Sequence, residues 1–157
     1  MRNITIAFFV LLNSFAFAQS TEISGSYDKI GKFSNGVAIV HKGGLVGAIG
    51  MDGKEIIKPS YEKISAFGKD GIAYTYKNGL VGLIDNHGNV IVDNSYDMIG
   101  RFNGDKAVVR KNGLCGVINR NGKVIIEPKY AKLKVEKGGI VKAVKDDGSE
   151  VLLKTNE

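Results

Sequence analysis

The feature that most constrains this chain is an internal repeat of 34 or 35 residues. Tyrosines mark the period at Tyr27, Tyr61, Tyr96 and Tyr130. Two glycine series keep the same spacing, one at Gly47, Gly82 and Gly116 and the other at Gly53, Gly88 and Gly122. A fixed period of this length is typical of proteins built from small units that bury their apolar faces by stacking.

The repeat defines a domain over residues 27–157. Three complete units span 27–60, 61–95 and 96–129, and a shorter fourth unit spans 130–157. The fourth unit keeps an apolar, strand-like stretch over 140–145 but lacks the last part of the pattern. A shortened final unit is typical of a terminal cap, which has no following neighbour to cover.

Each complete unit is predicted to form a three-stranded antiparallel β-meander, because turn dipeptides separate short runs rich in Val and Ile. The first turns are Gly43-Gly44, Asn78-Gly79 and Asn112-Gly113, and the second turns are Asp52-Gly53, His87-Gly88 and Asn121-Gly122. Such pairs tolerate the positive φ angles of type I′ hairpin turns. We therefore expect an all-β tandem repeat array that is open and curved. A closed, propeller-like ring is the alternative, although propeller blades usually have four strands.

The rest of each unit is predicted to be a connector with one buried face. Its apolar residues recur three apart, as Tyr27, Ile30 and Phe33, as Tyr61, Ile64 and Phe67, and as Tyr96, Ile99 and Phe102. The glycines Gly47, Gly82 and Gly116 fall within predicted strands, where glycine is unfavourable unless another group approaches closely. We expect a Tyr or Phe ring of the connector to pack over each of these glycines.

The N-terminus predicts a cleaved signal peptide over residues 1–18. Arg2 precedes an apolar run from Ile4 to Leu12, and the small residues Ala16 and Ala18 precede the expected cleavage point. The apolar run is too short for a membrane-spanning helix, which needs about 20 residues. The expected mature chain starts with a short lead over residues 19–26. It carries no transmembrane segment and is periplasmic or secreted.

Composition and charge exclude several classes of protein. Hydrophobic residues make up 43% of the chain and charged residues 24%, which argues against global disorder. The formal net charge is +6, but the basic residues are interleaved with acids, so no nucleic-acid partner is expected. The single cysteine, Cys115, cannot form an internal disulfide. It takes the place that Val46 and Val81 hold in other units, which favours its burial.

The combined pattern resembles the bacterial WG repeat family, also called the KWG repeat. It consists of Y-[DE]-x-I-x-x-F, then G-x-A, then K-N-G-L-x-G-x-I and a later G-x-V-I-x-P, and it covers residues 27–129 well and 130–153 loosely. The signature Trp of the family is replaced here by Val46, Val81 and Cys115. The resemblance implies a β-rich repeat module, often exported or envelope-associated, with no established catalytic activity.

The sequence offers no pattern for catalysis, metal binding or a cofactor. His41 and His87 occupy different repeat positions, and the oxygen-rich turns at 85–89 and 146–150 lack the spacing of a calcium loop. We therefore expect a non-catalytic module, without cofactor, that binds an envelope or extracellular protein. The candidate contacts vary between units and are His41, Tyr74, Tyr76 and Lys111. Two alternatives stay open: a binder of envelope polysaccharide or another anionic polymer, and a structural envelope component.

Overall fold

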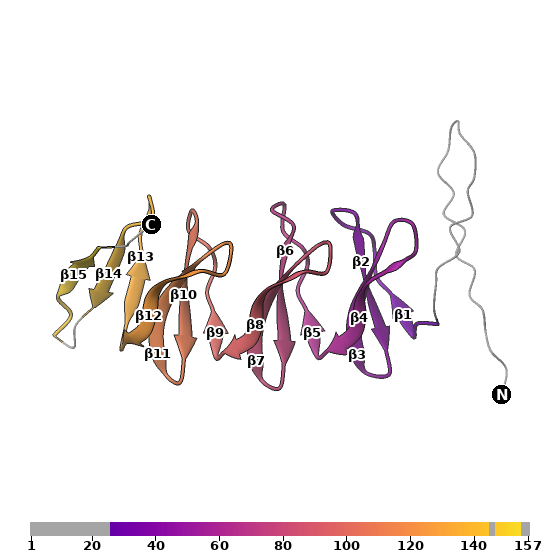
Figure 1. The fold of residues 1–157 in the computed structure, drawn as a ribbon, viewed down its shortest axis with the longest axis horizontal. Coiled ribbons are helices and arrows are strands. Elements are labelled where there is room, and N and C mark those ends of the chain that lie inside the picture. Colours follow the sequence, from indigo (N-terminus) through magenta and orange to yellow (C-terminus); the bar gives the residue numbers. More distant parts are fainter. Residues whose placement is uncertain (1–25, 145–146, 155–157) are drawn as a thin grey trace.

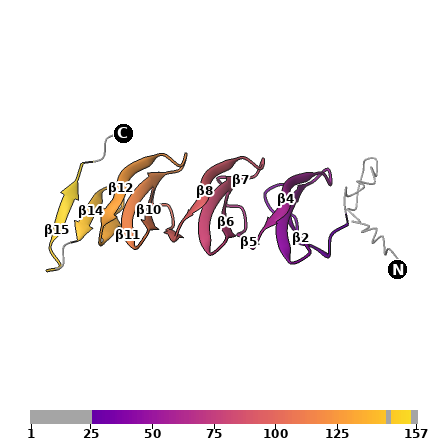
Figure 2. The ribbon, with the colours of Figure 1, turned by 60° about the horizontal axis from the view of Figure 1, so that its bottom comes forward.

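A computed structural model describes residues 26–144 and 147–154 of the chain. Its fifteen strands form four antiparallel sheets, which follow one another in an open row (Figure 1). Figure 2 shows the same row turned by 60°, with the first and last sheets at opposite ends. The all-β repeat array is confirmed, and a closed ring is excluded. The predicted signal peptide, residues 1–18, and the lead up to residue 25 lie outside the described residues.

The strands are hydrogen-bonded in sequence order within each sheet. The first sheet contains β1 (Lys29–Ile30), β2 (Val37–Lys42), β3 (Leu45–Gly50) and β4 (Glu55–Tyr61). The second contains β5 (Lys63–Ile64), β6 (Ile72–Lys77), β7 (Leu80–Asp85) and β8 (Val90–Tyr96). The third contains β9 (Met98–Ile99), β10 (Lys106–Lys111), β11 (Leu114–Asn119) and β12 (Val124–Tyr130). The last has only β13 (Leu133–Val135), β14 (Val141–Val144) and β15 (Glu150–Leu153).

The first three sheets have one strand more than the predicted meander. The extra strand comes from the connector, whose first residues pair with the following strand: Ile64 lies opposite Thr75, and Ile99 lies opposite Val109. The last strand of each of these sheets also runs further than expected, for example to Tyr61 in β4. The marker tyrosines after Tyr27 therefore end strands of the preceding sheet.

The two turns of each unit differ in backbone conformation. In the first turns both central residues have positive φ, such as 54° at Asn78 and 72° at Gly79, so the type I′ prediction is confirmed there. In the second turns only the glycine has positive φ, as at Gly88 with 89°. The Gly88 amide donates to the Asp85 carbonyl at 3.1 Å, and the Asp85 amide donates to the Asn89 carbonyl at 2.9 Å. These are three-residue loops closed by a left-handed glycine, so the type I′ prediction was wrong for the second turns.

The glycines within strands are needed because backbone, and not an aromatic ring, passes over them. The pairing of β3 with β4 shifts between Val46–Tyr61 and Ala48–Ile57, so extra residues of β4 bulge across Gly47. A Cβ on Gly47 would lie 2.4 Å from the carbonyl oxygen of Ile57. Equivalent backbone atoms crowd Gly82 and Gly116. The predicted close approach is confirmed, but the predicted ring over the glycine is wrong.

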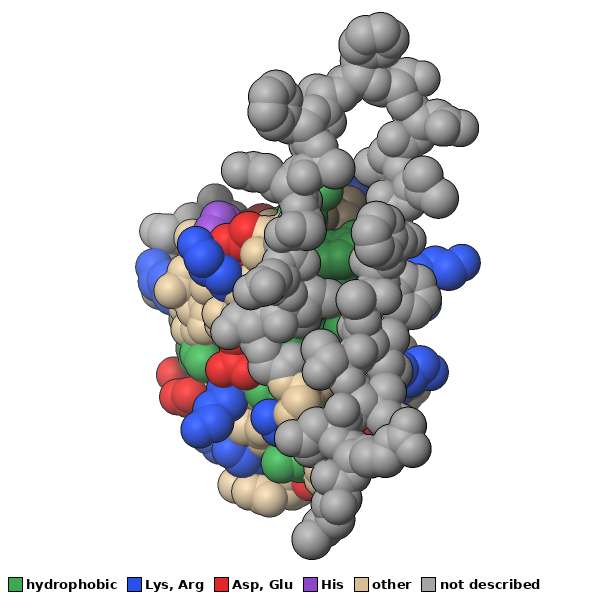
Figure 3. All heavy atoms as spheres, turned by 90° about the vertical axis from the view of Figure 1, so that its right-hand side faces the viewer, with side chains coloured by type: hydrophobic (Ala, Val, Ile, Leu, Met, Phe, Trp, Pro, Cys, Tyr) green, Lys and Arg blue, Asp and Glu red, His purple; other side chains and the backbone are tan. Residues whose placement is uncertain are grey.

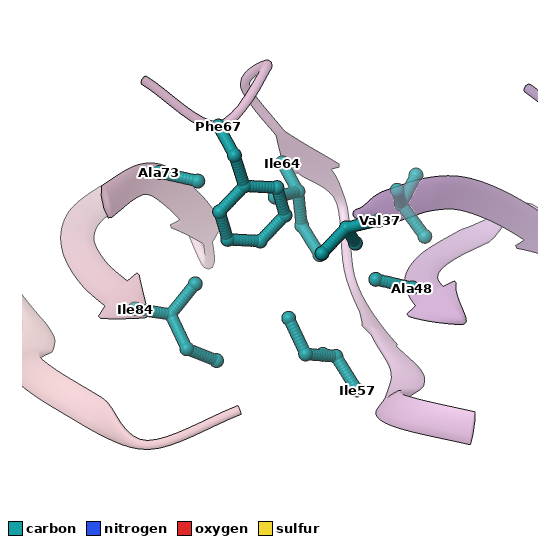
Figure 4. Packing of buried hydrophobic residues seen from close by; sticks show 8 residues of the cluster. Val37, Ala48, Ile57, Ile64, Phe67, Ala73 and Ile84 are labelled. Atoms are coloured by element: carbon teal, nitrogen blue, oxygen red, sulfur yellow. The ribbon is translucent and has the colours of Figure 1, made fainter. Parts of the chain in front are cut away.

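The hydrophobic core lies between neighbouring sheets. Figure 4 shows the first of these layers, in which Val37, Ala48 and Ile57 of the first sheet face four residues of the second unit, namely Ile64, Phe67, Ala73 and Ile84. Similar layers lie between the second and third sheets and between the third and last sheets. Strand side chains alternate between the two faces of a sheet, so each inner sheet contributes to two layers. No sheet of this size buries an apolar face alone, and stacking solves that problem.

Candidate interaction surface

The first turns lie along one edge of the row, at the bottom of Figure 1. Repeated lysine–tyrosine pairs lie beside these turns. In each complete unit the lysine just before the first turn lies over the ring of the marker tyrosine. The Nζ-to-centroid distances are 5.9 Å for Lys42 and Tyr27, 5.9 Å for Lys77 and Tyr61, and 5.5 Å for Lys111 and Tyr96. These are cation–π distances. We call these six residues the lysine–tyrosine edge.

In each complete unit, the acidic residue after the marker tyrosine holds the first turn in place. The Gly43 amide donates to Asp28 Oδ2 at 2.7 Å, and the Asn78 amide donates to Glu62 Oε1 at 2.8 Å. In the third unit the Gly113 amide donates to Asp97 Oδ2 at 3.1 Å. The Tyr-acid pair of the repeat pattern therefore has two structural roles. The tyrosine ring makes a cation–π contact with a lysine, and the carboxylate accepts a hydrogen bond from a turn amide.

The tyrosines of the edge remain neutral phenols near neutral pH. Burial raises the pKa of Tyr27, Tyr61 and Tyr96 above the ordinary tyrosine value. A nearby carboxylate adds to the rise in each case, from Glu55, Asp93 and Glu127 respectively. Each lysine of the edge therefore lies over an uncharged ring.

A variable position lies next to this edge. His41 pairs with Val46, Tyr76 with Val81, and Arg110 with Cys115, so the first residue of each pair occupies the same register position. We call His41, Tyr76 and Arg110 the variable slot. Arg110 was missed in the sequence analysis, and Lys111 belongs to the lysine series instead. Aligning the runs that start at Ala38, Ala73 and Ala107 would have revealed this.

The predicted contacts differ in their surroundings. Tyr74 is half-buried between the second and third sheets, and its hydroxyl donates to the Gly100 carbonyl at 3.0 Å. Burial raises the pKa of Tyr74. Tyr76 packs against the same layer, with Lys63 Nζ 5.3 Å from its ring centroid. His41 is half-buried and Lys111 is exposed. Tyr74 thus ties two units together, and contact roles for the four residues stay predictions.

The opposite edge of the row holds neighbouring units together. Asn35 Nδ2 donates to the Phe67 carbonyl at 2.9 Å, and Asn103 Nδ2 donates to the Val135 carbonyl at 3.2 Å. Arg120 of the third unit forms an ion pair with Asp70 of the second, and its guanidinium lies 4.8 Å from the Phe102 ring centroid. These ties fix the order and spacing of the variable slots along the row.

The chemistry available in the described part of the chain is limited. The Cys115 side chain is buried, as predicted, and its Sγ lies 3.6 Å from the Ala131 carbonyl oxygen. Among residues 26–144 and 147–154, no group of three or more His, Cys, Asp or Glu side chains is placed to hold a metal ion. The same residues include no helix long and apolar enough to cross a membrane.

Comparison with known proteins gives one result. A family model described as WG containing repeat matches residues 23–45, 47–80, 82–115 and 116–148, which together make up most of the chain. Each of the first three matched segments contains one Tyr-acid pair and one first turn. No curated protein matches the sequence.

Proposed function

This chain belongs to the family of WG-containing repeat proteins, and from that premise we propose that it is an exported, non-catalytic module that binds a protein partner. The partner would reside in the bacterial envelope or outside the cell. Family membership and the stacked sheets make the chain a β-repeat module. The N-terminal pattern over residues 1–18 supports export, because it has the charged, apolar and small-residue regions of a signal peptide.

The main support for the proposal is that the residue type in the variable slot differs between units, whereas the adjacent lysine–tyrosine edge is the same in all three. Three units repeat the lysine–tyrosine pair and the acid-bound turn, whereas the neighbouring slot changes from His41 to Tyr76 to Arg110. Repeat proteins commonly bind through extended surfaces built on a repeated framework. Tyrosine and arginine are enriched among the residues that dominate protein–protein binding energy. A row of different side chains on one rigid edge suits an irregular protein surface.

A second candidate, an anionic polymer, is favoured by the lysine series. Lys42, Lys77 and Lys111 recur at one position along one edge, so they present positive charge at regular intervals. A polysaccharide or polyphosphate chain with a matching period would use them all. Binding of that kind depends on exposed charges and falls steeply with ionic strength, whereas a packed protein interface is less sensitive.

Capture with matched variants tests both candidates. Residues 19–157 would be immobilised, exposed to envelope extract at low and moderate salt, and compared with Arg110→Glu and Lys123→Glu. Arg110 lies in the variable slot, and Lys123 is an exposed basic residue at the second turn of the same unit. We expect a protein that is retained at moderate salt, that Arg110→Glu weakens by about tenfold or more, and that Lys123→Glu leaves bound. Equal capture by all three proteins would contradict binding through the variable slot. Recovery of sugar only at low salt would support binding of an anionic polymer.

Export is tested separately by N-terminal sequencing of the chain isolated from its host. A start at Gln19 supports cleavage of the signal peptide. A chain that keeps Met1 and residues 2–18 contradicts it.

A further inference from the structure

The last sheet lacks the strand that completes each of the other sheets. In the first three sheets a fourth strand pairs with the third, as β12 pairs with β11. In the last sheet β15 pairs with β14, and no strand of the described residues pairs with its other side. β15 lies at the C-terminal end of the row (Figure 2). We call the unpaired side of β15 the free edge.

Backbone groups of β15 point out along the free edge. The Val144 amide donates to the Lys132 carbonyl at 3.1 Å, so the backbone groups of Val144 and, two residues earlier, of Lys142 face β13. The residues opposite them in β15 are Glu150 and Leu152. In an antiparallel pair, residues opposite each other turn their backbone groups either toward each other or both away. The N–H and C=O groups of Glu150 and Leu152 therefore point away from β14.

A groove beside the free edge marks the space that a fourth strand fills in a complete unit. Ala143 and Val151 lie opposite each other and line this groove. Their counterparts in the second sheet, Thr75 and Gly82, are covered by Asn94 of the fourth strand. Asn94 Nδ2 donates to the Thr75 carbonyl at 2.9 Å, and a Cβ on Gly82 would lie 3.0 Å from the Asn94 nitrogen. The groove is thus the place of the fourth-strand bulge.

The groove selects the kind of strand that fits. A bulge brings a carbonyl oxygen to 2.5 Å from a Cβ at Gly82, so the side chain of Val151 at the same position excludes it. A straight strand avoids that clash. Its inward side chains would meet a groove lined mainly by apolar groups, among them Tyr130, Ala143 and Leu153. The matching segment is therefore extended, regular and apolar at alternate positions.

The complete sheets end in strands that discourage further pairing, whereas β15 does not. Their fourth strands all pair with register shifts, and two of them contain a proline, Pro59 or Pro128. Bulges and prolines are common protections of sheet edges. β15 pairs with β14 without a register shift and contains no proline. The first sheet, at the opposite end of the row, is complete, and Figure 3 shows mixed charged and hydrophobic side chains at that end.

We propose that the free edge binds an extended segment of the protein partner, which adds to β15 as a fourth antiparallel strand. Backbone hydrogen bonds to Glu150 and Leu152 supply the binding, and alternate apolar side chains enter the groove. The precedent lies in the chain itself, since three of its sheets hold a strand at this edge. The inference rests on the proposed function in taking the partner to be a protein and residues 19–157 to be the mature chain.

The test titrates ¹⁵N-labelled residues 19–157 with a synthetic peptide, Lys-Val-Thr-Val-Thr-Val-Lys, blocked at both ends. We expect NMR shifts at Glu150, Leu152 and the groove, and hydrogen exchange of the Leu152 amide that slows about tenfold or more. A control peptide has its valine and threonine nitrogens methylated. It should bind about tenfold more weakly or worse, because it cannot donate backbone hydrogen bonds to the edge.

Two variants at one position separate the backbone from the side chain. Leu152→Ala keeps the N–H group at the free edge and should bind the peptide like the parent. Leu152→Pro removes that N–H, which proline tolerates on an edge strand, and should weaken binding about tenfold or more. Circular dichroism checks the fold of both variants. If Leu152→Pro does not fold, the methylated peptide tests the same hydrogen bonds.

Three outcomes overturn the proposal. They are the absence of shifts around β15 at saturating peptide, equal binding of the methylated peptide, and a Leu152 amide that is already protected before peptide is added. The last result would mean that the chain itself covers the edge. The titration uses purified chain and a synthetic peptide, so its result is independent of the capture experiment with Arg110→Glu. Failure of one leaves the other to stand.

Discussion

The last sheet differs from the three before it on the face that points toward the C-terminal end. Lys142 occupies the position of Tyr74 and Val108, and Glu150 occupies that of Val81 and Cys115. Lys142 Nζ lies 2.9 Å from Glu150 and 3.1 Å from Glu136. The first three sheets need apolar residues there because another sheet stacks on them, whereas no further sheet follows the last one among the described residues. A repeat position is therefore set by what lies against it.

The glycine series makes the same point within the sheets. Gly47, Gly82 and Gly116 are crowded by the bulge of the next strand, but the last sheet lacks that strand, and Val151 stands at the position of Gly116. A β-branched residue suits a strand better than glycine once the space is free. The substitution shows that the bulge, and not the strand itself, demands glycine.

Substitutions at Gly82 and Val151 test this difference between the sheets most directly. Gly82→Val should cost about 3 kcal/mol or more, since its Cβ alone would lie 2.5 Å from the Val92 carbonyl oxygen. Val151→Gly should cost only about 1 kcal/mol, mainly in backbone entropy. Urea unfolding monitored by circular dichroism measures both. Similar losses for the two variants would contradict the role given to the bulge.

A second exchange compares buried and terminal leucines at one register position. Leu83 is fully buried between the second and third sheets, whereas Leu152 is 65% exposed. Leu83→Ala should destabilise the chain by about 2–5 kcal/mol through lost burial and a cavity. Leu152→Ala should change stability by about 0.5 kcal/mol or less. If Leu152→Ala proves as costly as Leu83→Ala, the outer face of the last sheet is covered in solution.

The charged end can also be converted into an inner face. The double variant Lys142→Val and Glu150→Val removes the central ion pair and restores the apolar character found at Val108 and Val81. We expect it to self-associate, because the apolar outer faces of the last sheets of two chains can then stack on each other. Light scattering over a concentration series measures this. An association state equal to that of the parent would show that the ion pairs do not prevent stacking.

The smallest expected effect is the pH dependence of the last sheet. Hydrogen bonds from the two lysines lower the pKa of Glu136, and the bond from Lys142 lowers the pKa of Glu150. Hydrogen bonds to the same carboxylates raise the pKa of Lys134 and of Lys142. A carboxyl group whose pKa is lowered by folding stabilises the protein at pH values above its pKa in the unfolded chain. This stabilisation is lost as the pH falls through its pKa in the folded protein. A lysine whose pKa is raised by folding also stabilises the protein, and this stabilisation is lost as the pH rises through its pKa in the folded protein.

The Ala143 methyl resonance should therefore shift at both pH extremes before the Ala107 resonance of the third sheet does. NMR spectra over a pH series measure this difference. In Glu150→Gln the dependence on the acid side should shrink, because that residue no longer titrates. Simultaneous change of both methyl groups at every pH would mean that the ion pairs have no local effect.

The sequence predicted the repeat, the first turns and the burial of Cys115, because each depends on a residue's own properties or on comparison between units. It did not predict the strand formed by the connector. Ile64 and Ile99 have the spacing of neither strand nor helix, and only pairing with the next strand orders them. The half-burial of Tyr74 could not be predicted from the sequence. Its hydroxyl donates to the carbonyl of Gly100, which lies 26 positions away in the chain.

Local sequence is sufficient to set the period, the three strands of each meander with the turns between them, and the alternation of apolar residues that makes every inner sheet two-sided. These follow from local φ preferences and from side-chain periodicity. Stacking and strand pairing establish which group crowds Gly47, which residues share the slot of His41, and how the two ends of the row differ. Each of those depends on which backbone or sheet lies opposite, and that is settled only when the units stack.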